Sequence, residues 1–318
     1  MTSPGGTGRL TVHPVPGEGA EDVLVLTSGP EEGSVVTGTT DGSLWCVSHD
    51  GRRLRQVANT GGHPLGIEEH PDGRLVVCDA DRGLLRVDLA TGAVEVAADS
   101  HEGRPLRVCN NAAVATDGTV YFSDSSQVHD LDRWHHDLVH QTRSGRLLRL
   151  APDGTVSVLL DGLAFANGVA LSPEEDFVCV AETGARTLVR LWLTGRRAGL
   201  RDYLAMGLPG YPDNLSQGSD GLLWVALASP TDAVLERLQA APQKLRRLAL
   251  RTPERLQPGP RRSVRVRAYD TEGTLVHDLD LDAAAHGVSY HAVTGVREHA
   301  GRVWMGSFAE PAIAVWDR

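Results

Sequence analysis

The sequence predicts an all-β fold, a six-bladed β-propeller that takes up residues 1–318 as a single domain. One strand–turn–strand pattern recurs six times along the 318 residues. Its short strands are rich in Val, Leu and aromatic residues, and long helical periodicity is scarce. Six four-stranded antiparallel units in about 300 residues are typical of a six-bladed propeller. A β-sandwich or two smaller β domains would also be all-β, but equal spacing of six units favours the propeller.

The six units follow one another along the chain. Their first residues are Glu21, Leu65, Asn110, Asn167, Asp213 and Thr294. The last unit has only about three strands, and an apolar stretch at residues 9–15 precedes the first unit. We expect residues 9–15 to supply the missing outer strand, because a blade shared by both ends of the chain protects its sheet edges.

The six first residues share one register. Asn110, Asp213 and Leu65 each lie seven residues before the aspartate of a DG turn. The first strand of a propeller blade lines the central channel, so we expect these residues to form a ring at one channel mouth. Four members carry oxygen-bearing side chains: Glu21, Asn110, Asn167 and Asp213. Carboxylate and amide oxygens suit a hard cation, so the ring predicts a divalent metal site, with Ca²⁺ preferred and Mg²⁺, Mn²⁺ or Zn²⁺ as alternatives.

The first of two insertions covers residues 127–143 and is expected near the channel mouth. It contains four histidines and three aspartates. If it is helical, His136 and His140 lie on one face, because residues four apart are neighbours on a helix. A polar surface segment, a metal site and a substrate-contacting segment all fit this composition.

The second insertion, residues 231–260, is also expected near the channel mouth. Leucines at helical spacing predict two short helices, and Pro242 separates them. Such helices could cap the channel and exclude water. They could also pack against a partner or a membrane surface, since Lys244, Arg246, Arg247 and Arg251 form a basic cluster.

Composition excludes several classes of function. The formal net charge is −10 and there is no basic stripe, which argues against nucleic-acid binding. The four cysteines form no CxxC pair, so neither a zinc site nor a redox dithiol is indicated. No stretch resembles a signal peptide or reaches transmembrane length. We therefore expect a cytoplasmic protein that acts on a small molecule without a membrane partner; the oligomeric state stays open.

Several motifs together resemble a known superfamily. The stretches FANGVALSPEEDFVCVAET, LPGYPDNLSQGSDGLLWVA and VREHAGRVWMGSF resemble the strictosidine synthase-like branch of the gluconolactonase and senescence-marker-protein superfamily. The resemblance runs through most of the chain and implies six blades. Its hydrolytic members hold one divalent cation, usually Ca²⁺, in the channel. The implied metal ligands fall on Glu21, Asn110, Asn167 and Asp213.

The resemblance also implies individual roles. The aspartate of the PDN motif, Asp213, would also be the base, and Asn111 would be the second residue of an ND pair. Strictosidine synthases carry a catalytic glutamate where this sequence has Thr294, within HAVTG. That departure argues against their condensation reaction. It leaves open another condensation or cyclisation that uses, for example, His291.

The leading hypothesis is a metal-dependent hydrolase of a lactone or ester. The cation would stabilise charge on the carbonyl oxygen, and Asp213 would accept a proton from the attacking water. Two alternatives are a biosynthetic enzyme that condenses or cyclises a natural-product intermediate in the same channel, and a non-catalytic binding propeller with a structural ion. The candidate substrate contacts are Asn111, His136, His140, His291 and Thr294.

Overall fold

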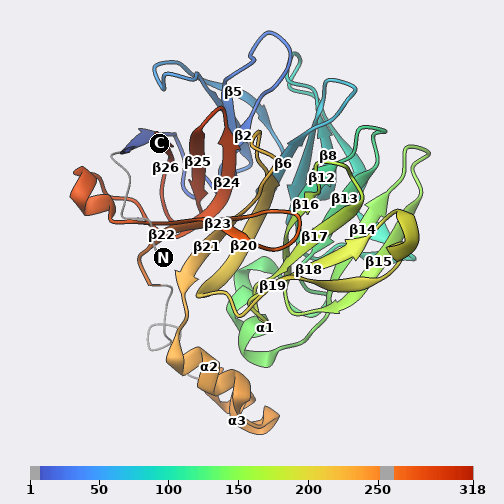
Figure 1. Ribbon diagram of the computed structural model, residues 1–318. Coiled ribbons are helices and arrows are strands. Elements are labelled where there is room, and N and C mark those ends of the chain that lie inside the picture. The colour runs from blue at the N-terminus through green and yellow to red at the C-terminus, as the bar shows by residue number, and fades with distance from the viewer. Residues whose placement is uncertain (1–7, 251–260, 318) are drawn as a thin grey trace.

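The computed structural model describes residues 8–250 and 261–317, and six four-stranded sheets dominate it (Figure 1). Blade 1 consists of β2 (Leu24–Val25), β3 (Val35–Gly38), β4 (Ser43–Val47) and β5 (Leu54–Asn59). Blade 2 consists of β6 (Pro64–Glu69), β7 (Leu75–Asp79), β8 (Gly83–Val87) and β9 (Val94–Ala98). Blade 3 consists of β12 (Cys109–Val114), β13 (Val120–Asp124), β14 (Gly145–Leu150) and β15 (Val156–Leu163).

The other three blades repeat this order. Blade 4 consists of β16 (Ala166–Leu171), β17 (Phe177–Glu182), β18 (Thr187–Trp192) and β19 (Arg201–Met206). Blade 5 consists of β20 (Gly210–Gln217), β21 (Leu223–Pro230), β22 (Val264–Tyr269) and β23 (Leu275–Leu281). Blade 6 consists of β24 (Val293–His299), β25 (Arg302–Ser307), β26 (Ala312–Asp317) and β1 (Arg9–Pro14). A small hairpin, β10 (Ser100–His101) and β11 (Arg104–Pro105), follows blade 2.

The two ends of the chain meet in blade 6, as the sequence predicts. Strand β1 pairs antiparallel with β26, from Arg9 opposite Asp317 to Pro14 opposite Ala312. The side chain of Leu10 is buried in the same apolar cluster as Trp316. This pairing gives blade 6 its fourth strand and closes the ring, so the predicted six-bladed propeller is confirmed.

The hydrophobic core lies between neighbouring blades. One cluster joins Cys78 and Leu84 of blade 2 to Phe122 and Leu148 of blade 3. Another joins Trp224 of blade 5 to blade 6. All four cysteines are buried free thiols. Because each blade buries its two faces against its neighbours, the ring of first residues is held by contacts around the whole circle.

An alternation of residue size locks the first strands together. The residue after each ring position is large and polar in the odd blades and glycine in the even blades: Asp22, Gly66, Asn111, Gly168, Asn214 and Gly295. A Cβ on Gly168 would lie 2.1 Å from the Leu215 nitrogen. The glycines therefore let the polar residue of an adjacent odd blade approach closely.

Two of these polar residues connect their blade to the next. The Ile67 N–H donates to Asp22 Oδ2 at 3.0 Å, and the Val169 N–H donates to Asn111 Oδ1 at 2.7 Å. Both acceptors are buried. Asn214 differs, because its Nδ2 donates to Glu21 Oε2 at 3.2 Å. Side chains next to the ring thus hold the blades in register.

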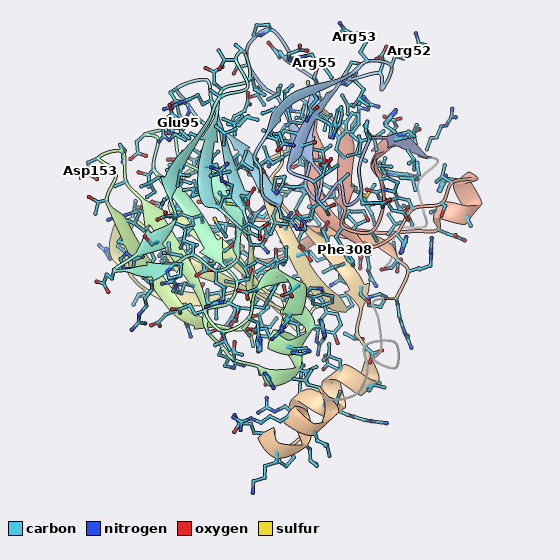
Figure 2. The ribbon with its side chains drawn as sticks, turned by 180° about the vertical axis from the view of Figure 1, so that it is seen from behind. Arg52, Arg53, Arg55, Glu95, Asp153 and Phe308 are labelled. Atoms are coloured by element: carbon cyan, nitrogen blue, oxygen red, sulfur yellow. The ribbon has the colours of Figure 1, made fainter. Side chains whose placement is uncertain are left out.

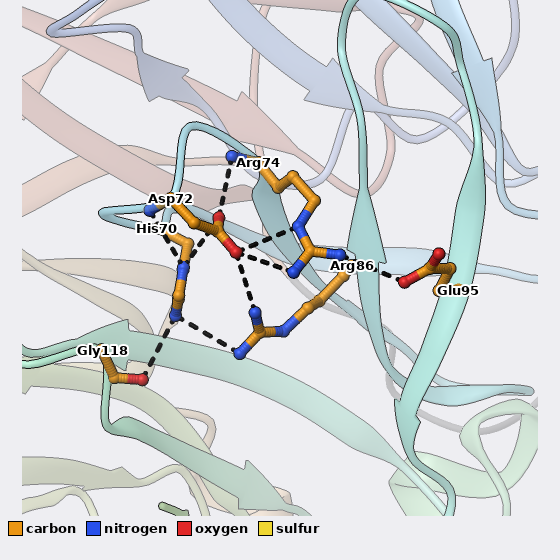
Figure 3. Close-up of polar contacts among 6 residues, drawn as sticks. All are labelled: His70, Asp72, Arg74, Arg86, Glu95 and Gly118. Carbon is orange, nitrogen blue, oxygen red and sulfur yellow. Dashed lines mark hydrogen bonds and ion pairs between the residues drawn. The ribbon is translucent and has the colours of Figure 1, made fainter. Parts of the chain in front are cut away.

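Turns at the opposite end of the first strands add surface links, as Figure 3 shows for blades 2 and 3. His70 Nε2 lies 3.2 Å from the Gly118 carbonyl oxygen, across the gap between the two blades. Asp72 accepts from Arg74 at 2.7 Å and from Arg86 at 2.9 Å. These groups are partly exposed, so the links fix turn geometry more than they add stability.

Both insertions lie at the ring end of the channel, and we call their helices the helical cap. The cap comprises η1 (Leu131–Arg133), α1 (Trp134–His140), α2 (Ala233–Ala240) and α3 (Gln243–Ala249). Pro242 separates α2 from α3, as predicted. In Figure 1, α1 lies beside the blades, whereas α2 and α3 project beyond it. Residues 251–260 of the second insertion, including Arg251, lie outside the described residues.

Hydrogen bonds fix the cap to itself and to the blades. Gln239 donates to the Leu138 carbonyl at 3.1 Å, and Arg246 donates to the His140 carbonyl at 2.8 Å. Arg186 of blade 4 pairs with Glu236 of α2 at 3.0 Å. Two further short helices, η2 (Gly195–Arg197) and η4 (Ala283–His286), lie in connections elsewhere. Within the described residues, no helix is long and apolar enough to cross a membrane.

The alternation predicts a strong effect at Gly168. Gly168→Ala should destabilise the protein by about 3 kcal/mol, because the new methyl group meets backbone that cannot move without separating two blades. Gly154→Ala is the control: its Cβ would meet nothing within 4 Å, and its positive φ of +86° adds strain of only about 1 kcal/mol. Urea unfolding measures both. Equal losses in the two variants would contradict the close-packed alternation.

Candidate metal centre and binding cavity

One cavity of about 700 Å³ lies between the ring and the helical cap. Its volume falls within the range of about 300–1,000 Å³ that is usual for small-molecule sites. All six ring residues line it: Glu21, Leu65, Asn110, Asn167, Asp213 and Thr294. Equal register in the sequence therefore corresponds to a shared position at one channel mouth.

The two ring asparagines each present an oxygen that lacks a hydrogen-bond partner. Asn110 and Asn167 are 4% and 3% exposed. Within the described part of the chain, Oδ1 of each is buried and accepts no hydrogen bond. An unsatisfied buried acceptor costs about 1–3 kcal/mol, so native structures rarely keep one without a ligand. Two of them facing the same cavity indicate a site for a cation or a donor.

The orientation of the Asn167 amide follows from its neighbour. Thr183 donates its hydroxyl hydrogen to the Pro212 carbonyl at 2.7 Å, so the Thr183 oxygen is available as an acceptor. Asn167 Nδ2 donates to that oxygen at 3.2 Å. This bond uses one hydrogen of the NH₂ group and fixes the amide, so that Oδ1 is the atom left without a partner.

Glu21 is held from two sides. Thr294 donates its hydroxyl to the Glu21 backbone oxygen at 2.7 Å, and Asn214 donates to the Glu21 carboxylate. Glu21 itself is 6% exposed. Thr294 thus lines the cavity, and its hydroxyl fixes the position of Glu21. Asp213 is less enclosed than Glu21 and is only partly buried.

Burial and like charge disfavour ionisation of the two ring carboxylates. Burial, and then the charges of Asp213 and Asp22, raise the pKa of Glu21 well above its usual value. Burial raises the pKa of Asp213 to about 7. The hydrogen bond from Asn167 lowers this pKa, whereas the negative charge of Asp22 raises it. A divalent cation between the carboxylates would remove this penalty, because it favours both charged forms.

The charge of the cavity lining also favours a cation. Six acidic side chains line it: Glu21, Asp81, Asp130, Asp132, Asp213 and Asp232. No lysine or arginine lines it among the described residues. A cleft lined by one sign of charge concentrates ions of the opposite sign.

The candidate ligand set mixes carboxylates with amides. Within residues 8–250 and 261–317, no group of three or more His, Cys, Asp or Glu side chains is arranged to hold a metal. The ring has only two such residues, Glu21 and Asp213, and its other two oxygens come from amides. Ca²⁺ accepts both kinds of oxygen, so the donor set fits a hard cation and not a thiolate- or imidazole-bound metal.

Residues two places before the ring form a second layer of the cavity lining. They are Gly19, His63, Phe165 and Tyr211. The sequence pattern did not single them out, although the same register places Phe165 and Tyr211 two positions earlier in FANG and GYPDN. The Tyr211 hydroxyl donates to Glu236 at 3.3 Å and accepts from the Asp232 N–H at 3.2 Å, which ties α2 to this layer.

The helical cap supplies apolar walls. Trp134, Leu138 and Val139 of α1 and Val234, Leu235 and Leu238 of α2 line the cavity. Phe308, labelled in Figure 2, also lines it and is 39% exposed. The cap therefore covers the cavity, as one of the two sequence-based interpretations of residues 231–260 expects.

The other proposed substrate contacts lie elsewhere. Asn111, His136, His140 and His291 are not among the described residues that line the cavity, whereas His135 is. The Asn111 amide is used between blades 3 and 4. His140 Nδ1 lies 3.1 Å from His129 Nε2 on the other side of α1, and His291 pairs with Glu310. The rotation of α1 about its axis determines which of its histidines faces the cavity. It is His135, because residue 135 lies on the same face of the helix as residues 138 and 139, which also line the cavity.

Stability of the metal-free protein should fall as the pH rises from about 4 to about 7. The folded state binds the Asp213 proton more tightly than the unfolded chain, whose aspartate pKa is about 3.9, so this contribution is present below pH 4 and lost through pH 7. Asp213→Asn should flatten the slope, and the exposed Asp161→Asn is the matched control. Melting temperatures measured in chelator test this. An identical slope in the wild type and Asp213→Asn would contradict it.

Comparison with solved structures supports the fold. A gluconolactonase from Xanthomonas campestris superposes with a TM-score of 0.70 at 17% identity, covering 98% of this chain and 90% of its own. Regucalcin from Agrobacterium tumefaciens, described as a calcium-binding protein, superposes with a TM-score of 0.65 at 15% identity, covering 97% and 92%. At these identities the likeness concerns the fold alone.

Sequence comparison identifies closer relatives. The sequence profile of the strictosidine synthase family matches residues 110–196. The adipocyte plasma membrane-associated protein of Salmo salar is 32% identical over 329 residues, with 93% of this chain and 76% of the relative covered. Strictosidine synthase-like 10 of Arabidopsis thaliana is 32% identical over 266 residues, with 80% and 70% covered. The chain therefore belongs to the family of the strictosidine synthase-like and adipocyte plasma membrane-associated proteins.

Proposed function

We propose that the protein is a divalent-metal-dependent hydrolase of lactones or esters. The observation that carries the proposal is the pair of unpartnered oxygens of Asn110 and Asn167 beside the buried carboxylate of Glu21 and the partly buried carboxylate of Asp213. Glu21, Asn110, Asn167 and Asp213 would hold the ion, with Ca²⁺ preferred. When bound there, the ion supplies Lewis-acid stabilisation of charge on a carbonyl oxygen. The likeness to a gluconolactonase and to regucalcin supports this choice.

The two carboxylates have different surroundings and so different roles. Glu21 is fixed through both its backbone and its carboxylate, which suits a metal ligand. Asp213 is partly exposed in the cavity, so a water can reach its carboxylate, and a bound cation would keep that carboxylate deprotonated and able to accept a proton. Asp213 is therefore the residue that accepts a proton from an attacking water.

The cavity walls restrict the substrate. Leucines, Trp134 and Phe165 line the space around the ring, and the acidic lining repels anions. A neutral ester or lactone with an apolar group fits both features.

The strictosidine synthase family match favours a second candidate, a biosynthetic enzyme that joins or cyclises substrates in the same cavity. Thr294 occupies the place at which the resemblance implies a glutamate, and its hydroxyl is committed to the Glu21 carbonyl. This residue therefore offers no acid or base for that chemistry. Mass spectrometry distinguishes the two candidates, because hydrolysis adds water to the substrate and cyclisation does not.

Chelation should abolish hydrolysis, and Ca²⁺ or Mn²⁺ should restore it. The assay uses a panel of aryl esters and small lactones with EDTA treatment followed by metal add-back. The proposal predicts loss and recovery of rate, because substrate activation depends on the ion. Activity that ignores both treatments on every substrate hydrolysed would show that the metal-dependent mechanism is wrong.

Asp213→Asn should lower kcat by about 10²- to 10⁴-fold, the usual contribution of a positioned base. The exposed Asp153→Asn, far from the ring, is the control for removal of one carboxylate (Figure 2). If Asp213→Asn weakens metal binding or lowers the melting temperature while the rate with saturating Ca²⁺ is unchanged, the ion is structural and Asp213 is not the base. If the wild type also hydrolyses no substrate tested, the non-catalytic binding propeller replaces this proposal.

A further inference from the structure

Exposed apolar side chains fall into two groups on this protein. Seven of them lie along or next to outer blade strands: Leu54, Val96, Leu200, Tyr203, Met206, Leu275 and Val276. The other five lie in the two insertions or line the cavity: Val128, Val234, Leu245, Leu248 and Phe308. Three members of the second group, Val234, Leu245 and Leu248, lie on α2 and α3, and large exposed apolar side chains on a projecting element usually mark an interaction surface.

Helix α3 carries two parallel rows of side chains. Leu245 and Leu248, 55% and 60% exposed, are three residues apart and lie on one side. Lys244 and Arg247, both exposed, have the same spacing and form the adjacent row. Arg246 is partly buried and bonded to the His140 carbonyl, which holds the helix in this orientation. An aliphatic row flanked by cations is the pattern of an interfacial helix.

The charge of this segment is opposite to that of the whole protein. The net charge of the chain is −10. Residues 233–250 have four basic side chains, Arg237, Lys244, Arg246 and Arg247, against one acid, Glu236, which gives a local charge of +3. This difference orients the molecule toward an anionic surface.

We infer that α2 and α3 dock the protein on an anionic phospholipid surface, with Leu245 and Leu248 inserted and Lys244 and Arg247 at the headgroups. The projecting shape of α2 and α3 in Figure 1 suits insertion into a deformable bilayer. A second copy of the chain would bring the same cations face to face. This surface departs from the sequence-based expectation of no membrane partner, and it does not depend on the proposed hydrolase activity.

Docking would also place the cavity entrance at the membrane. Val234, Ala249 and Leu250 line the cavity and lie on the same two-helix segment as the exposed leucines. Apolar side chains of this segment thus line the cavity and are also exposed on its outer side. An apolar substrate dissolved in the bilayer could enter without crossing water.

The test is sedimentation with phosphatidylcholine vesicles, with and without phosphatidylserine. The wild type should bind the anionic vesicles, and bind them less as salt increases. Lys244→Gln with Arg247→Gln should weaken binding by about fivefold for each basic side chain removed, which corresponds to about 1 kcal/mol each. Leu245→Ser with Leu248→Ser should remove binding to a similar or greater extent.

Two matched controls replace aliphatic or basic side chains that lie away from α3. Leu275→Ser with Val276→Ser replaces aliphatic side chains that are 42% and 46% exposed on β23. Arg52→Gln with Arg53→Gln removes two exposed cations at the opposite end of the molecule (Figure 2). Both controls should bind vesicles like the wild type, and all variants should keep the wild-type melting temperature.

Three outcomes would overturn the inference. The first is a wild-type protein that binds neither vesicle at low salt. The second is loss of binding that is equal in the α3 variants and in the controls. The third is self-association, measured by light scattering, that Leu245→Ser with Leu248→Ser abolishes, because it would assign this surface to a second copy.

Discussion

Two carboxylates that would repel each other, Glu21 and Asp213, line one cavity, and the packing of the blades depends on holding them there. They belong to blades 1 and 5, and the pairing of β1 with β26 closes the ring that holds both. Burial raises both pKa values, so the metal-free site is unfavourable at neutral pH. The packing between blades holds it in place, and a bound cation would relieve it.

The ring residues could be predicted from the sequence, because equivalent positions in repeated units occupy equivalent positions in the blades. Counting seven residues back from the turn selected five residues, and the matching strand after Glu21 selected the sixth; all six line one cavity. The same reasoning could have found Phe165 and Tyr211, two places earlier. It could not assign Asn111, because its role depends on an amide hydrogen bond from the next blade. The repeat also could not predict which histidines of the first insertion line the cavity, because packing against the blades and α2 sets the rotation of α1.

The blades and the insertions contribute different parts of the site. The ring depends on backbone register and on short hydrogen-bond chains such as Pro212–Thr183–Asn167. The cap carries no ring residue but provides the apolar walls and the exposed leucines. Thr294 illustrates how the family could vary its chemistry. One hydroxyl at that position orients Glu21, whereas a carboxylate there would add a third charge to the ring.

The position of a bound metal tests the central claim most directly. Crystals grown with Mn²⁺, which accepts the same oxygen ligands as Ca²⁺ and scatters anomalously, would locate the ion. The account predicts one strong anomalous peak bonded to Glu21, Asp213 and the Oδ1 atoms of Asn110 and Asn167. A cavity without a peak at saturating Mn²⁺, with both amide oxygens satisfied by water alone, would contradict it.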